Sequence, residues 1–295
     1  MADNSPDKMN ISVCDIPDGN GLTVDHMPDL LQDKGFDNCA PHTHYFYEIL
    51  WFQEGNGTHT IDFVDYEVKP DTIFFISPGQ IHHFDRSHGY RGVTIKMCKD
   101  LMRDEAGTCG LFMKYDVFHT FDSTPYYYIT PDTAAALHTL VGQIEEESER
   151  NGAFGNAEVL ESLLRILLVK IIREGRKDGS RQLSSVKPSH ILFIRFRKAV
   201  EQEYARLHTV QEYASLLNVS QRTLYKCVNE CADMSPLSFI NGRIMLEAKR
   251  RVRYTNMLIK EIAFSLGFED PSYFVKLFRR HTGYLPSDFR EADNV

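Results

Sequence analysis

The chain has 295 residues, enough for two domains with separate hydrophobic cores, and a formal net charge of −8. No uncharged apolar run reaches the roughly 18 residues that a membrane-spanning helix needs, and residues 1–10 lack a hydrophobic signal segment. The six cysteines contain no Cys-x-x-Cys pair. We therefore expect a cytoplasmic protein without membrane spans or structural disulfides. We interpret Cys227 and Cys231, one helical turn apart, as small apolar helix residues rather than a metal clip or redox switch.

The first hundred residues predict β structure. Residues 1–35 are polar and rich in Pro and Gly, so we expect an irregular arm with one or two edge strands. Between residues 41 and 97, β-branched and aromatic runs alternate with turn signals at residues 55–57 (Gly-Asn-Gly) and 69–71 (Lys-Pro-Asp). Several short strands with close turns indicate a β-sandwich or small barrel.

Two helices are expected next, over residues 130–150 and 156–175. Large apolar residues form a wide stripe along the second: Leu160, Leu163, Leu164, Leu167, Leu168, Ile171 and Ile172. The stripe could simply cover the barrel, but its width favours burial against a second copy, and we predict a homodimer through this region. Residues 176–187 are polar and charged, and we expect a linker there.

Charge is distributed unevenly between the two parts of the chain. Residues 183–295 carry 17 Lys and Arg against 12 Asp and Glu, a net charge of +5. The first 182 residues carry 16 basic and 29 acidic residues, a net charge of −13. Because phosphate neutralisation is local, the C-terminal part is compatible with DNA binding, and the acidic part is not expected to contact DNA.

One pattern occurs twice in the last ninety residues. Four apolar residues recur 49 positions later: Val210, Tyr213, Ala214 and Leu217 as Ile259, Ile262, Ala263 and Leu266. After one insertion the offset is 50, and Leu224, Val228, Pro236 and Phe239 return as Phe274, Phe278, Pro286 and Phe289. Each copy begins with the stripe of a short helix, followed by a turn at Asn218 or Gly267 and a second helix. The repeat predicts two helix-turn-helix units in tandem.

The second helix of each unit is the candidate DNA reader. Ser220 and Asp270 are expected N-caps, and Pro271 suits the first helical position. Helical spacing places the following residues toward the major groove: Gln221, Arg222, Tyr225 and Lys226 in the first unit, and Ser272, Val275, Lys276 and Arg279 in the second. The residues expected to pack inside the second unit are Tyr273, Phe274, Leu277 and Phe278.

A single helix is expected between the units, over residues 237–254. At about 1.5 Å per residue it spans roughly 27 Å, close to the roughly 34 Å between successive major-groove faces on one side of a duplex. One polypeptide would then read two adjacent turns of DNA. The alternative is a helical scaffold with solvated basic faces.

The C-terminal region closely resembles the AraC family of bacterial transcription regulators. The stretch LIKEIAFSLGFEDPSYFVKLFRRHTGYLPSDFR resembles the family signature, and TVQEYASLLNVSQRTLYKCVNECADMSPLSFI resembles its first helix-turn-helix. The resemblance covers roughly residues 190–290 and implies a seven-helix DNA-binding domain. By matching position it places Arg222, Tyr225, Lys226, Ser272, Val275 and Lys276 at base edges. Pro271 stands where some relatives have a polar base-contacting residue, so the second helix is expected to contribute less direct readout.

Residues 42–82 resemble the two cupin motifs. His42-Thr43-His44, Glu48 and Gly55 resemble the first, and Pro78-Gly79 with His82 partly resembles the second. Two residues depart from the second motif: Asp71 replaces a Gly and Ser77 a Pro. In metal-binding cupins two His, one Glu and a later His converge, and such a set suits Fe(II), Mn, Ni, Zn or Cu. On a strand, even-numbered spacing would point His42, His44 and Glu48 to one face.

Three interpretations of His42, His44, Glu48 and His82 stay open: hydrogen-bonded structural residues, polar groups of an effector pocket, and a metal site. A cupin joined to this DNA reader resembles the sensing half of AraC-type regulators, which usually bind no metal. We therefore assign these residues to an effector pocket and expect no metal, cofactor or catalytic residue.

The sequence thus predicts an α+β protein with a cupin-like β-barrel and flanking helices, followed by an all-α domain with two helix-turn-helix units. We expect an effector-binding and dimerisation domain at 1–175, a linker at 176–187 and a DNA-binding domain at 188–295. The predicted function is a sequence-specific transcription regulator controlled by a small-molecule effector, and not an enzyme. Expected partners are double-stranded promoter DNA, a sugar or other metabolite, RNA polymerase and a second copy of the chain. The alternative is a metal-dependent cupin enzyme fused to a DNA-binding module.

Overall fold

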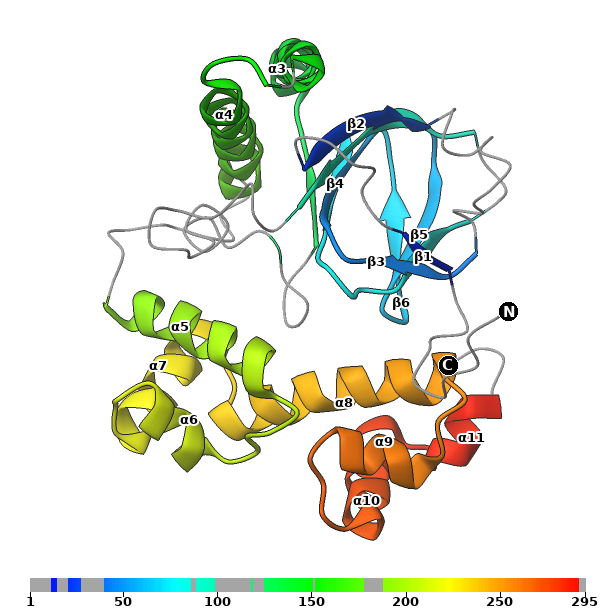
Figure 1. Ribbon diagram of the computed structural model, residues 1–295, viewed down its shortest axis with the longest axis vertical. Helices are drawn as coiled ribbons and strands as arrows, with labels where there is room; N and C mark the ends of the chain where they lie inside the picture. The colour runs from blue at the N-terminus through cyan, green and yellow to red at the C-terminus, as the bar shows by residue number, and fades with distance from the viewer. Residues whose placement is uncertain are drawn as a thin grey trace. The chain divides into compact units, whose positions relative to one another are not determined.

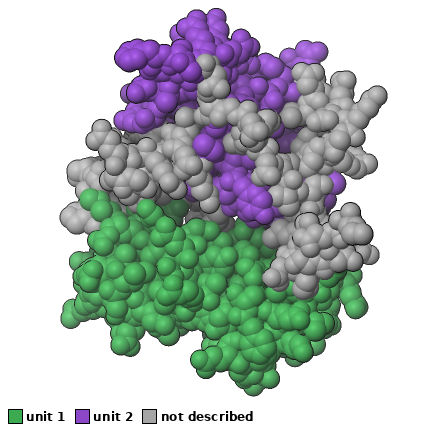
Figure 2. All heavy atoms as spheres, viewed as in Figure 1, with its two compact units in different colours: residues 1–10, 183–295 green, residues 11–182 purple. Residues whose placement is uncertain are grey.

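The computed structural model describes residues 12–14, 21–27, 40–85, 89–98, 118, 125–150, 152–177 and 188–291. Contacts between Cα atoms divide the chain into two compact units, one of residues 11–182 and one that contains residues 183–295 (Figure 2). Most of the expected linker, residues 178–187, lies outside the described residues. Among the helices that are described, none is long and apolar enough to cross a membrane.

The described strands of the first unit form two five-stranded sheets (Figure 1). The first sheet has the order β1 (Ser12–Cys14), β3 (His42–His44), β8 (His82–Phe84), β5 (Gly57–Ile61) and β6 (Val64–Val68). The second has the order β10 (Tyr126–Tyr128), β7 (Thr72–Ile76), β4 (Tyr47–Glu54), β9 (Arg91–Met97) and β2 (Leu22–His26). The two strands of the N-terminal arm, β1 and β2, are edge strands of different sheets, which confirms that prediction.

The central strands of the second sheet are buried on both faces. On β4, Leu50 and Phe52 pack with residues of β5, β6 and β8 in one apolar cluster. The alternate residues Ile49 and Trp51 belong to a different cluster, which includes the helices α3 (Pro131–Glu149) and α4 (Asn156–Lys177). Because successive side chains of a strand point to opposite faces, this double burial explains why β4 is a nearly continuous apolar run.

Helices α3 and α4 lie beside the second sheet (Figure 1). Six residues of the apolar stripe on α4 are buried in the cluster that also holds the sheet and α3, and Leu163 is partly buried against it. Val159 and Ile166 on the same helix stay exposed. The width of the stripe therefore reflects contact with the sheet and α3 within one chain. It offers no argument for a dimer, and the homodimer stays a prediction.

Between residues 188 and 291 the chain forms seven helices, the number that the family resemblance implied. They are α5 (Pro188–Glu203), α6 (Val210–Leu216), α7 (Gln221–Ala232), α8 (Pro236–Tyr254), α9 (Ile259–Ser265), α10 (Pro271–Thr282) and α11 (Pro286–Glu291). Helices α6 and α7 form one helix-turn-helix, and α9 and α10 form the other (Figure 1). The turns contain Asn218 with φ of 55° and Gly267 with φ of 81°, the left-handed conformation that Asn and Gly tolerate best.

Helix α8 connects the two helix-turn-helix units and is buried along most of its length. Arg243 on α8 donates two hydrogen bonds of 2.8 Å to Glu201 on α5. Eight residues further on, about two helical turns, Arg251 donates a hydrogen bond of 2.8 Å to Ser265 at the end of α9. The helix expected as a spacer is thus joined by charged side chains to the supporting helices on either side of it.

Candidate functional site

The first candidate recognition helix, α7, is shaped by a cap and a buried stripe. The Ser220 hydroxyl accepts a hydrogen bond of 3.1 Å from the Thr223 amide, which confirms the predicted N-cap. Leu224 and Val228 are buried on the inner face. Cys227 is buried beside them and donates to the Ser189 carbonyl at 3.0 Å, and burial raises the pKa of its thiol to about 12. A neutral, buried thiol fits the interpretation of Cys227 as a small core residue.

The four predicted DNA-facing residues of α7 are all exposed: Gln221, Arg222, Tyr225 and Lys226. Lys226 is 78% exposed and lies 3.7 Å from Glu230, a surface contact that contributes little. The outer face of α7 therefore presents two cations and an aromatic ring that are available to a polyanion.

Helix α10 repeats this design. The Asp270 carboxylate accepts a hydrogen bond of 2.8 Å from the Ser272 amide, which confirms the second cap. Ser272, Lys276 and Arg279 are exposed, and Val275 is half-buried. Both recognition helices thus carry their predicted contact residues on the side away from the core.

Tyr273 departs from the prediction. It was expected to pack inside, but 58% of it is exposed. Phe274 and Phe278 fill the inner face of α10, and Tyr273 lies at its edge, with its ring centroid 6.1 Å from that of Phe268. The repeat contained a signal for this position, because the offset of 50 aligns Tyr273 with Thr223, a polar residue.

The loop before α6 packs against the turn of the second helix-turn-helix. The His208 ring lies 4.8 Å from the Phe268 ring, measured between centroids. A Cβ atom on Gly267 would lie 2.3 Å from the Ala205 carbonyl oxygen. Together with the ion pairs of α8, these contacts fix the two recognition helices relative to each other within one unit.

A cluster of buried polar residues occupies the interior of the first unit. His42 and His44 on β3, Glu48 on β4 and His82 on β8 are each at most 5% exposed. We predicted that His42, His44 and Glu48 share one face of a strand, which is wrong because β3 and β4 belong to different sheets. The chain bends at residues 45–46 between the two strands, and the side chains meet across the interior instead.

The geometry brings three of the four predicted residues together most closely. Glu48 Oε2 lies 3.3 Å from His44 Nε2 and 3.6 Å from His82 Nε2. His42 lies beside them, with its ring centroid 4.1 Å from that of His82 and its Nδ1 3.0 Å from the Ala40 carbonyl oxygen. These residues lie in positions where they could bind one ligand jointly.

A fifth residue of the cluster, His59 on β5, was not predicted. It is fully buried, and its Nε2 lies 3.1 Å from His82 Nδ1. His59 and Ile61 have the same parity on β5 and are both buried, so alternation along the strand was a signal that could have identified it.

Burial controls the charges in this cluster. It lowers the pKa of His42, and it lowers the pKa of His59 and His82 well below their usual value, so these rings are neutral at neutral pH. Burial pushes the pKa of Glu48 upward, but close contact with His44 and the charge of Lys96 outweigh it and leave the pKa below its usual value. The interior therefore holds the Glu48 carboxylate together with the neutral rings of His42, His59 and His82.

The two departures from the cupin motif have structural counterparts. Asp71 adopts φ of 62°, the left-handed conformation that suits the Gly of the motif. Ser77, in place of Pro, leaves a buried hydroxyl oxygen without a hydrogen-bond partner in the described part of the chain. The backbone conformation at residue 71 is thus compatible with the motif despite the substitution.

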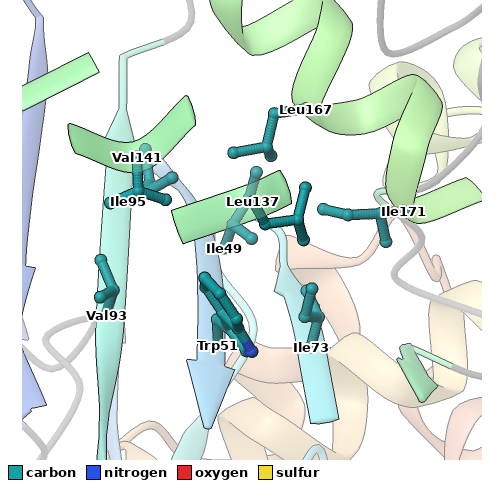
Figure 3. Close-up of a pocket in the computed structure, with 9 residues that line it drawn as sticks. All are labelled: Ile49, Trp51, Ile73, Val93, Ile95, Leu137, Val141, Leu167 and Ile171. Carbon is teal, nitrogen blue, oxygen red and sulfur yellow. The ribbon is translucent and has the colours of Figure 1, made fainter. Parts of the chain in front are cut away.

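A separate apolar pocket lies between the second sheet and helices α3 and α4 (Figure 3). It is lined by Ile49, Trp51, Ile73, Val93, Ile95, Leu137, Val141, Leu167 and Ile171. Its cavity volume of about 10 Å³ is room for about one water molecule. Small-molecule sites usually have several hundred Å³, so this pocket is a packing defect of the core rather than an effector site.

Two capped helices with exposed basic faces, supported by a single buried helix, define a helix-turn-helix DNA-binding protein. Two family models match the chain and together cover most of it: an AraC-like ligand binding domain at residues 32–167 and a helix-turn-helix domain at residues 213–292. The chain belongs to the AraC family, and it is a DNA-binding transcription regulator with a ligand-binding domain.

Curated relatives and solved structures resemble the chain over different lengths. It is 24% identical over 267 residues to the HTH-type transcriptional activator RhaR of Escherichia coli strain K12, covering 88% of this chain and 89% of the relative. ToxT of Vibrio cholerae O395, bound to (E)-4-(8-methylnaphthalen-1-yl)but-3-enoic acid, is 16% identical, with a TM-score of 0.42, and the match covers 83% of this chain and 90% of ToxT. A DNA-binding transcriptional dual regulator of Escherichia coli K-12 is 25% identical, with a TM-score of 0.31, over 37% of this chain and 95% of that one.

Proposed function

We propose that the chain is a one-component, sequence-specific regulator in which one polypeptide reads two successive major grooves. The observation that carries this proposal is the pair of capped recognition helices, α7 and α10, whose exposed faces carry Arg222, Lys226, Lys276 and Arg279. A footprint on a selected operator should therefore show protection of two adjacent turns per polypeptide. Protection of a single turn would contradict the proposal.

Base reading is assigned to Gln221, Arg222, Tyr225, Lys226, Ser272, Val275, Lys276 and Arg279. Replacing Arg222 or Lys276 by Ala should weaken binding to the selected operator by about 1–3 kcal/mol if each residue contacts a base. A matched control is Arg206→Ala, because Arg206 is 77% exposed and lies outside both recognition helices. Equal loss of affinity for operator and unrelated DNA would make Arg222 and Lys276 phosphate contacts instead.

Control by a small-molecule effector is the second part of the proposal. The effector would bind at His42, His44, Glu48 and His82, in a domain whose family model describes an AraC-like ligand binding domain. It would change the N-terminal arm or the arrangement of a homodimer, and thereby the spacing of two DNA-binding domains at a promoter recognised by RNA polymerase. Such control requires different effector affinities for the two arrangements. Sedimentation showing a monomer at micromolar concentration would refute the homodimer.

Domain boundaries belong to the same proposal. We place the effector-binding domain at residues 1–175, the linker at 176–187 and the DNA-binding domain at 188–295. Limited proteolysis of the full chain should therefore cut first within 176–187 and release two stable fragments. Early cleavage inside α5, at residues 188–203, would move the boundary.

A metal-dependent enzyme fused to a DNA-binding module is the alternative, favoured by the convergence of His44, Glu48 and His82. We expect no enzymatic activity. Turnover that depends on a bound metal would support the enzyme, whereas promoter occupancy that changes with a metabolite would support the regulator.

A further inference from the structure

Three possible ligand atoms meet in the buried cluster of the first unit. One ligand atom from each of His44, Glu48 and His82 lies within 4.8 Å of the other two. Glu48 Oε2 lies 3.3 Å from His44 Nε2 and 3.6 Å from His82 Nε2. Each is buried, and none has a hydrogen-bond partner among the residues that the structure describes. Buried polar atoms are normally paired, so three unpaired atoms that face each other require an explanation.

Hydrogen bonding fixes which ring nitrogen of His44 faces the carboxylate. Its Nδ1 lies 2.8 Å from the Phe46 carbonyl oxygen, which can only accept, so Nδ1 carries the proton. In the neutral ring Nε2 then holds a lone pair, and it lies 3.3 Å from the Glu48 carboxylate. At this distance either a proton on Nε2 or a metal ion bound by both atoms can join the ring to the carboxylate.

His82 can present a lone pair in the same direction. Its Nδ1 lies 3.1 Å from His59 Nε2, so a proton on His82 Nδ1 can be donated to His59. His82 Nε2 then faces Glu48 Oε2 at 3.6 Å, a separation too long for a direct hydrogen bond. A metal-binding histidine commonly donates its other ring nitrogen to a neighbour, which is the arrangement of both His44 and His82.

We propose that His44, Glu48 and His82 bind a divalent first-row transition-metal ion and that His59 is a positioning residue for His82. Two imidazoles with one carboxylate suit Fe(II) or Zn²⁺ rather than Mg²⁺, which prefers oxygen ligands. Burying a single charged carboxylate is costly, and a bound divalent cation beside it would offset that cost. This inference rests on the proposed function in one respect, that the buried cluster is the ligand site of the regulator. The metal site reverses our expectation from sequence, which ranked it below an effector pocket without metal.

The test uses the full chain, stripped of metal with a chelator and titrated with Zn²⁺ by calorimetry, with Mg²⁺ as the comparison ion. We expect one Zn²⁺ per chain and no Mg²⁺ binding under the same conditions. Co²⁺ should give the visible absorption of a low-coordinate site, a readout independent of any activity. Absence of stoichiometric Zn²⁺ binding at micromolar protein, or equal binding of Mg²⁺, would overturn the proposal.

Variants separate ligands from neighbours. Glu48→Gln keeps the side-chain shape and His82→Asn removes a ligand, so both should lose the site. His83→Asn is the matched control, because His83 is the next residue on β8 and only half-buried; it should bind Zn²⁺ as the unmodified chain does. His59→Leu should retain one site but bind roughly 10- to 100-fold more weakly. Unchanged affinity in His59→Leu would refute its positioning role, and loss in His83→Asn equal to that in His82→Asn would refute the assignment of ligands.

Two measurements keep this test independent of folding and of DNA binding. Circular dichroism identifies any variant that fails to fold, and Glu48→Gln, the most conservative change, then decides the outcome. Arg222→Ala should bind Zn²⁺ normally while losing operator affinity. If Arg222→Ala keeps its operator affinity and also binds Zn²⁺, the proposed DNA readout fails and the metal site stands. If Glu48→Gln binds Zn²⁺ as the unmodified chain does, the metal site fails and the proposed DNA readout stands.

Discussion

Glu247, near the middle of α8, is surrounded by three arginines. Its carboxylate oxygens lie 3.4 Å from Arg243, 3.5 Å from Arg250 and 3.0 Å from Arg251, and it is 8% exposed. Burial alone would raise the pKa of Glu247, but the charges of Arg250, Arg243 and Arg251 lower it from 4.5 to about 2. At about 1.4 kcal/mol per pH unit, this difference corresponds to about 3 kcal/mol of stability.

Glu247→Gln should therefore lower the free energy of unfolding of the C-terminal unit by about 3 kcal/mol at pH 7, in line with the roughly 3–5 kcal/mol for breaking a buried ion pair. Because the folded-state pKa is below the unfolded value, the contribution is complete above pH 4.5 and is lost as the pH falls toward about 2. The variant and the unmodified chain should thus converge in stability at low pH.

The assay is urea unfolding of the full chain, followed by two signals. Far-ultraviolet circular dichroism reports mainly the helices, whereas the fluorescence of Trp51, the single tryptophan, reports the β-sheet unit. Glu247→Gln should lower the urea concentration at the midpoint of the transition followed by circular dichroism and leave the midpoint followed by Trp51 fluorescence unchanged. Glu230→Gln, an exposed carboxylate paired with Lys226, is the matched control and should cost at most about 0.5 kcal/mol. A loss below about 1 kcal/mol in Glu247→Gln, or one independent of pH, would refute the reasoning.

Three further predictions concern the helix-turn-helix units. Gly267→Ala should lower the Tm and operator affinity more than Gly283→Ala, because both have positive φ but only at Gly267 would a Cβ meet backbone within 4 Å; equal Tm losses would contradict this. Ser220→Ala should cost about 1 kcal/mol of stability in urea unfolding through loss of the cap, whereas Ser220→Asn should cost little, and equal losses would exclude capping as the cause. Tyr273→Ala should weaken operator binding in a gel shift with little change in Tm, while Phe274→Ala, its buried neighbour, should destabilise by about 3–5 kcal/mol; a large Tm loss in Tyr273→Ala would mean a core role.

Local signals in the sequence located the helices and turns of the C-terminal unit correctly. Ser220 and Asp270 were identified as caps, and Asn218 and Gly267 as turns, because each acts on backbone groups within three residues of itself. The apolar stripes were equally local, since the burial of Leu224 follows from helical spacing alone. These features were therefore predictable without knowledge of the tertiary fold.

Features that depend on distant segments were not predictable in the same way. The strands that carry His44 and Glu48 belong to different sheets, and His59 reaches His82 through pairing of strands 23 residues apart in sequence. Sheet assignment depends on such pairings, which alternation within one strand does not specify. The choice between two interpretations of the α4 stripe depended on distant segments too: within one chain it packs against the second sheet and α3, whose positions the sequence does not encode locally.

The proposal that α7 and α10 read two successive grooves has a consequence for promoters, because α8 between them is buried. A flexible linker would let the two recognition helices bind DNA segments at different separations. Helix α8 does not allow this, because it is buried and hydrogen-bonded to α5 and α9. Inserting one base pair between the two contacted segments shifts them by about 3.4 Å and rotates them by about 35°. Operators of this protein should therefore differ from one another by base substitutions and keep the same number of base pairs between the two contacted segments. Insertions or deletions between the segments should be rare in its promoters.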